Sequence, residues 1–130
     1  MFFETTIQIR VEDFKKGQQW YETLFEREPD FIAHEGFIEW EIISGCWLQV
    51  AEGTPAIGSG PIRFGVTDIE ETRNRLLKDL KIDPFEVHTR DGVPVKWGTF
   101  QDPWGNLVGV YEYLDKDAES ERLKTILRNE

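Results

Sequence analysis

Polar side chains recur at every second position in several short segments of the chain, a spacing that gathers them on one face of a strand. Gln8 and Arg10 show this spacing, and Glu39 and Glu41 repeat it further along. A carboxylate beside an arginine could transfer protons during catalysis. The same groups could instead pair with each other and close the interior, because an unpaired buried charge costs several kcal/mol. The sequence leaves both possibilities open.

Aromatic residues accompany these polar groups at other strand positions. Trp rings stack on flat molecules and on cations, and pockets for small molecules combine such apolar walls with a few polar groups. Gly109 has no side chain and would leave room for a ligand ring. The pattern does not decide which face of its strand Trp97 occupies. We expect a cleft that binds a small aromatic or cationic molecule. Its candidate residues are Gln8, Arg10, Glu39, Glu41, Trp47, Gln49, Arg63, Trp97 and Tyr111.

The elements that would position these side chains form a first module, about residues 3–52. Ile7, Ile9 and Val11 alternate with the polar positions, which predicts a half-buried strand whose polar face is turned toward the cleft. Asp13 is a predicted N-cap. The predicted elements are a strand at 3–11, a helix at 14–26, and strands at 31–33, 37–43 and 46–51.

A second module, about residues 61–113, repeats the first. Residues 7–14 are similar to residues 62–69, an offset of 55 positions, and residues 45–50 are similar to residues 105–110, an offset of 60. The predicted elements are a strand at 61–67, a helix at 69–81 that begins with an acidic capping box at Asp68 and Glu71, strands at 85–89, 93–101 and 107–113, and a C-terminal helix at about 115–130.

The composition argues against several classes of partner. The chain has 130 residues and a net charge of −10, and it lacks the clustered Lys and Arg that phosphate backbones require, so we expect no nucleic acid partner. No apolar stretch approaches the roughly 20 residues of a membrane span, so we expect no membrane partner. Cys46 is the single cysteine and forms no internal disulfide, and the N-terminus lacks a secretory signal. We expect a cytoplasmic protein.

Three local motifs mark the starts of helices and of the last strand. They are Arg10-Val11-Glu12-Asp13, Phe64-Gly65-Val66-Thr67-Asp68-Ile69 and Phe100-Gln101-Asp102-Pro103-Trp104-Gly105-Asn106. Together with the repeated βαβββ order, they resemble the vicinal oxygen chelate superfamily, which includes glyoxalases, bleomycin-resistance proteins and extradiol dioxygenases. The resemblance covers about residues 4–113. It implies two modules that enclose a ligand between them, and it favours a homodimer.

The resemblance also implies where a metal would bind. Metal-dependent relatives carry one ligand on each of four strands, and the ion acts as a Lewis acid. The matching positions in this chain are Thr6, Gln49, Pro61 and Gly109. Proline and glycine have no side-chain donor, and threonine and a lone glutamine are poor ligands for such an ion. His34 and His88 lie near predicted turns and are expected to be exposed. We therefore expect no metal and no cofactor.

The sequence thus predicts a single α+β domain, residues 1–130. Two paired βαβββ modules would form a curved, partly closed mixed sheet around a cleft, followed by a C-terminal helix. The favoured function is metal-independent binding of a small aromatic or cationic molecule, with catalytic residues unknown. One alternative is a metal-dependent lyase, epimerase or dioxygenase of the same superfamily. Another is an interaction module that uses the terminal helix.

Overall fold

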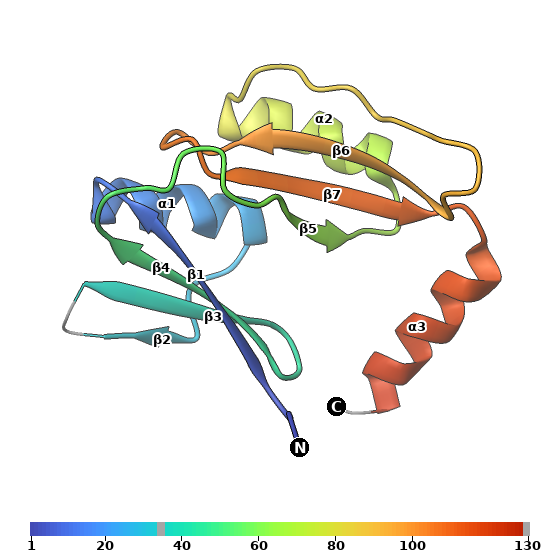
Figure 1. Ribbon diagram of the computed structural model, residues 1–130, viewed down its shortest axis with the longest axis horizontal. Coiled ribbons are helices and arrows are strands. Elements are labelled where there is room, and N and C mark those ends of the chain that lie inside the picture. The colour runs from blue at the N-terminus through green and yellow to red at the C-terminus, as the bar shows by residue number, and fades with distance from the viewer. Residues whose placement is uncertain (34–35, 129–130) are drawn as a thin grey trace. The chain divides into compact units, whose positions relative to one another are not determined.

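The computed structural model describes residues 1–33 and 36–128, and it has an α+β fold with two mixed sheets (Figure 1). The chain divides into two compact units. The first contains residues 1–57 and 103–106, and the second contains residues 58–102 and 107–130. His34 lies outside the described residues.

The first unit has a four-stranded sheet in the order β1-β4-β3-β2, in which β1 runs parallel to β4 and the other pairs are antiparallel. Its elements are β1 (Thr5–Val11), α1 (Phe14–Phe25), β2 (Phe31–Ile32), β3 (Phe37–Ile43) and β4 (Cys46–Glu52). This is the predicted βαβββ order, with a third element of only two residues.

Aromatic side chains fill the interior of the first unit between α1 and the sheet. Trp40 is fully buried on β3, and its ring lies 6.4 Å from Tyr21 and 5.3 Å from Phe25 of α1. Trp40 Nε1 donates to the carbonyl oxygen of Arg27, so the buried indole keeps a hydrogen bond. The side chain of Asp13 accepts from the backbone N–H of Lys16, which confirms the predicted N-cap.

The second unit has a three-stranded sheet in the order β5-β7-β6, in which β5 runs parallel to β7 and β6 is antiparallel to it. Its elements are β5 (Ile62–Gly65), α2 (Ile69–Leu80), β6 (Val95–Gln101), β7 (Leu107–Tyr113) and α3 (Lys116–Arg128). Asp68 caps α2 by accepting from the backbone N–H of Glu71, which is one half of the expected capping box.

The interior of the second unit is aliphatic, with one buried carboxylate. Ile69 and Leu76 of α2 are fully buried. Glu112 of β7 is 8% exposed and accepts from the backbone N–H of Ile69 at 2.8 Å and from Lys116 Nζ at 2.7 Å. One side chain therefore joins β7 to the start of α2 and to the first residue of α3.

The strand predicted at 85–89 is wrong. This segment makes a single bridge to β6, between His88 and Trp97. Before the bridge, the ring of Phe85 packs over Gly98, where an added Cβ would lie 2.6 Å from the ring, and beside Phe100 at 5.1 Å. The segment therefore covers β6 with an aromatic ring, and it does not extend the ladder of backbone hydrogen bonds.

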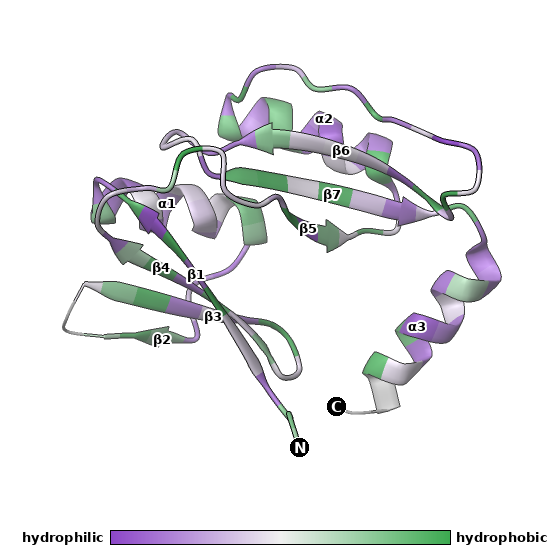
Figure 2. Cartoon of the chain, in the orientation of Figure 1, coloured by the Kyte–Doolittle hydropathy of each residue, from purple (hydrophilic) through white to green (hydrophobic). Residues whose placement is uncertain are grey.

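The C-terminal helix is polar with few apolar positions, as the sequence predicts, and hydrophilic stretches dominate α3 in Figure 2. Leu123, one of its apolar residues, is 42% exposed. Across residues 1–33 and 36–128, none of the helices has the length and apolar character that crossing a membrane requires.

Candidate functional site

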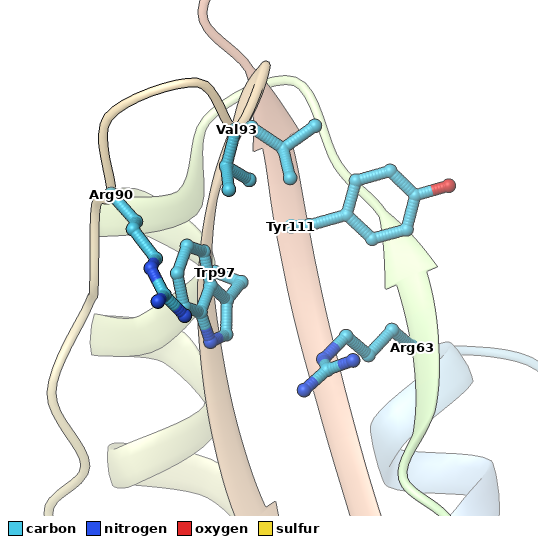
Figure 3. A pocket seen from close by; sticks show the side chains of 6 residues that line it. Arg63, Arg90, Val93, Trp97 and Tyr111 are labelled. Carbon is cyan, nitrogen blue, oxygen red and sulfur yellow. The ribbon is translucent and has the colours of Figure 1, made fainter.

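A hollow of about 540 Å³ opens on the sheet of the second unit (Figure 3). Its volume suits a ligand of one or two rings, because pockets for small molecules span roughly 300–1,000 Å³. All three strands of the sheet and the turn before β6 contribute to its lining. The lining residues are Arg63, Arg90, Val93, Val95, Trp97 and Tyr111.

The strand register places the predicted residues of this unit on one face. Tyr111 of β7 lies opposite Gly65 of β5 on one side and opposite Trp97 of β6 on the other. Arg63 lies two residues before Gly65, so it shares the face because side chains alternate along a strand. The face of Trp97, which the sequence left open, is therefore the face of Tyr111 and Arg63.

Arg63 extends across the strand beside it because that strand carries a glycine. An added Cβ at Gly109 would lie 3.0 Å from Arg63 Cγ and 2.7 Å from the carbonyl oxygen of Gly98. Figure 3 shows the guanidinium of Arg63 reaching from β5 across β7 toward the side of Trp97. The expectation that Gly109 leaves room for a ligand ring is corrected, since the aliphatic stem of Arg63 occupies that space.

Trp97 and Tyr111 are both held in place by neighbours. His88 and Trp97 exchange two backbone hydrogen bonds, of 2.7 and 3.0 Å, and their rings lie 5.8 Å apart. The ring of Tyr111 lies over Gly65, where an added Cβ would be 3.3 Å from it, and contacts Tyr113 edge to face at 6.0 Å. Both aromatic walls of the hollow are thus fixed before any ligand arrives.

The charged residues that line the hollow are both arginines. Among the described residues of the second unit, no carboxylate forms an ion pair with Arg63 or Arg90. By contrast, the lysines near Glu112 form ion pairs with it. Lys116 Nζ lies 2.7 Å and Lys96 Nζ lies 4.0 Å from its carboxylate oxygens. Burial alone would raise the pKa of Glu112, but the hydrogen bonds from Lys116 and Ile69 lower it below its usual value.

The predicted polar residues of the first unit also share one face, but there they form hydrogen bonds with one another. Gln8, Gln49 and Glu39 lie in one row across β1, β4 and β3. Gln8 Nε2 donates to Gln49 Oε1 at 3.1 Å, and Gln49 Nε2 donates to Glu39 Oε1. Amide and carboxylate therefore form a continuous hydrogen-bonded row on this face.

Three further candidates lie on the same face of the first unit. Glu41 lies opposite Trp47, and its Oε2 accepts from the backbone N–H of Gly45 at 3.2 Å, so this carboxylate closes the turn between β3 and β4. Arg10 lies opposite Ala51, and its Nε donates to Gln8 Oε1 at 3.5 Å. The expected pairing of Arg10 with Glu39 or Glu41 is not present among the described residues of this unit.

The structure therefore gathers the predicted residues into two groups, one on each unit. A cleft common to both groups stays a prediction. Arg90, Val93 and Val95 line the hollow but were missed by the sequence analysis. Arg90 belongs to the turn at 90–93, where Val93 N donates to Arg90 O at 3.0 Å and Gly92 takes a φ of +82°. The Arg-Asp-Gly turn signal was visible in the sequence, but it does not specify what the turn faces.

The positions at which the resemblance implies metal ligands do not fit a metal. Pro61 has no side-chain donor, and the space beside Gly109 is filled by the stem of Arg63. Both ends of the Gln49 amide are engaged in the polar row. Nowhere in residues 1–33 and 36–128 do three or more His, Cys, Asp or Glu side chains gather in a way that could hold an ion.

Comparisons with known proteins identify the fold. No protein family profile matches the sequence, and no curated protein matches it. Solved structures do match. A glyoxalase / bleomycin resistance protein from Catenulispora acidiphila is 22% identical, with a TM-score of 0.67, and the match covers 85% of this chain and 97% of that one.

Two further matching structures carry other names. The fosfomycin resistance protein FosX from Listeria monocytogenes is 18% identical, with a TM-score of 0.67 over 83% of this chain and 90% of that one. A lactoylglutathione lyase from Agrobacterium tumefaciens is 18% identical, with a TM-score of 0.66 over 83% of this chain and 91% of that one. The chain therefore has the glyoxalase / bleomycin resistance fold, the fold of the vicinal oxygen chelate superfamily.

Proposed function

We propose that the protein binds a small aromatic molecule in the hollow of the second unit and that it does so without a metal. The observation that carries the proposal is a hollow of about 540 Å³ whose lining includes two aromatic rings, Trp97 and Tyr111, on neighbouring strands. Rings of a ligand gain both buried apolar area and stacking against such walls. Because the walls are already held by His88 and Gly65, binding loses little side-chain entropy.

The alternative is an enzyme of the same fold, a metal-dependent lyase, epimerase or dioxygenase. The lactoylglutathione lyase among the matching structures is an enzyme by name, so the fold is compatible with catalysis. The side chains at the four implied ligand positions argue against a metal-dependent reaction in this chain. The described residues that line the hollow include two arginines, Arg63 and Arg90, and no His, Asp or Glu that could act as a general base.

Calorimetric titration with small aromatic compounds tests the proposal. We expect naphthalene derivatives to bind and to raise the melting temperature, because a ligand that binds only the folded state stabilises it. Their decahydronaphthalene analogues, which have the same carbon skeleton without the aromatic rings, should bind more weakly. A panel in which no aromatic compound binds would contradict the proposal. Elemental analysis of the purified protein tests the alternative, which predicts about one tightly held Ni, Zn, Mn or Fe ion per chain.

Two accompanying expectations belong to the same proposal. A homodimer is favoured by the resemblance and by the edge strands β1 and β2, whose unpaired backbone groups invite pairing with another chain. A cytoplasmic location is favoured by the composition and by the single cysteine.

A further inference from the structure

The hollow has a charge character opposite to that of the chain as a whole. The chain carries a net charge of −10, yet the two charged residues of the lining are arginines. They come from separate segments, Arg63 from β5 and Arg90 from the turn before β6 (Figure 3). Both arginines are exposed, so their charges are accessible to an anion bound in the hollow.

The chemistry of arginine narrows the class of anion. A guanidinium is planar and presents several N–H donors in a fixed fork, which matches the two oxygens of a carboxylate. The stem of Arg63 is supported by Gly109, and Arg90 begins a hydrogen-bonded turn. The backbone at both arginines is therefore already ordered. Their guanidinium groups can bind a ligand with little further loss of backbone entropy.

The remaining residues that line the hollow are apolar or aromatic. Val93 and Val95 add aliphatic surface next to the aromatic walls. A ligand that contacts the whole lining therefore needs a planar ring system that packs on Trp97 and Tyr111 and an anionic group that binds the arginines. We propose, on the basis of the proposed function, that the natural ligand class is a small aromatic carboxylate. The expectation of a cationic ligand, which rested on the stacking of cations against Trp rings, is replaced by this proposal.

Three matched probes test the charge preference by calorimetry. They are 2-naphthoate, 2-naphthamide and 2-naphthylmethylammonium, which share one ring system and differ in charge. We expect 2-naphthoate to bind about tenfold more tightly than either of the others, because only the carboxylate can accept charge-assisted hydrogen bonds from the two arginines. If the amide or the ammonium compound binds as tightly as the carboxylate, the inference is overturned while the proposed function stands. If none of the three binds, both fail.

Two variants locate the effect, with a third as the charge control. Arg63→Gln and Arg90→Gln should each weaken 2-naphthoate binding by about threefold, so that the two losses together account for the tenfold preference, and should weaken 2-naphthamide binding less. Binding of the amide shows that the hollow of each variant is still intact. Arg122→Gln removes the same charge from α3 and should leave both affinities unchanged. Equal weakening by Arg122→Gln, or none by the two hollow variants, would overturn the assignment.

Discussion

The two units repeat one pattern of elements, but equivalent positions on their sheets do different work. Gln8 pairs with Gln49 in the first unit, and at the offsets of the repeat Arg63 pairs with Gly109 in the second. Gln8 donates to Gln49, and Gln49 donates in turn to Glu39, so both amides are engaged within one polar row. In the second unit a glycine lets the arginine lie across the strand. Both members of the pair therefore differ between the units, and with them the chemistry of the two faces.

The largest expected difference between the units concerns a glutamate that occurs at the same place in both. Glu52 of β4 is exposed, whereas its counterpart Glu112 is 8% exposed and hydrogen-bonded to Ile69 and Lys116. Glu112→Ala should lower the free energy of unfolding by about 2–3 kcal/mol, because it leaves a buried N–H unsatisfied. Glu52→Ala should change it by less than about 0.5 kcal/mol. Urea unfolding followed by circular dichroism measures both, and equal effects would contradict the comparison.

The pH dependence of stability checks the same residue. The folded-state pKa of Glu112 lies below its usual value of 4.5, since the hydrogen bonds outweigh the effect of burial. Its stabilising contribution is therefore complete above pH 4.5 and is lost as the pH falls through the folded-state pKa. Glu112→Gln should lose stability less steeply than wild type in this acidic range. The pKa of Asp30 in the first unit is also lowered, against the effect of burial, by the backbone of Glu41 and by Arg27, so some acid dependence will remain.

The next effect concerns the glycine that supports the arginine. An added Cβ in Gly109→Ala would lie 2.7 Å from the carbonyl oxygen of Gly98, so β6 and β7 must shift. We expect a loss of about 1–2 kcal/mol in stability, together with weaker 2-naphthoate binding as Arg63 is displaced. Gln49→Ala is the counterpart in the first unit and should cost about 1 kcal/mol or less without changing binding. If Gly109→Ala left both quantities unchanged, the role of this glycine would be refuted.

The smallest expected effect compares two aromatic residues at equivalent positions. Trp97 lies opposite Tyr111 on β7, and Phe37 lies opposite Ala51 on β4. Trp97→Ala should weaken binding of 2-naphthamide by about tenfold, because the ligand loses one stacking wall. Phe37→Ala should leave this affinity unchanged. A neutral probe is chosen so that the arginines do not mask the result, and a similar loss in both variants would speak against a site on the second unit.

Most of the fold could be predicted because its determinants are local. Alternation with period two placed Gln8, Gln49 and Glu39 on a common face, and the two aspartate caps marked the starts of α1 and α2. The extended stretch at 85–89 was mistaken for a strand, since alternation there reflects the packing of Phe85 over Gly98. The sequence pattern of a segment that packs its side chains over a strand is the same as that of a segment that pairs with the strand through a ladder of backbone hydrogen bonds.

The site was predicted only in part, for two physical reasons. Strand residues such as Arg63 and Tyr111 follow from alternation, whereas Arg90 is brought to the hollow by a turn whose direction depends on the strands it joins. The partners of polar groups are also set by neighbours distant in sequence. The carboxylate of Glu41 accepts from the turn N–H of Gly45, and the arginine that reaches Glu41 is Arg27, which donates to its backbone carbonyl. No local signal in the sequence predicts these partners.

In each unit, a large residue lies opposite a small one on the neighbouring strand, and this limits how one unit could be converted into the other. In the first unit Arg10 faces Ala51, and in the second the order is reversed, with Gly65 facing Tyr111. If one half were converted into the other by single substitutions, an intermediate would have either two large side chains opposite each other or two small ones that leave a gap. A protein made of two copies of either half would therefore need these positions changed together, and divergence between the halves is hard to undo by single substitutions.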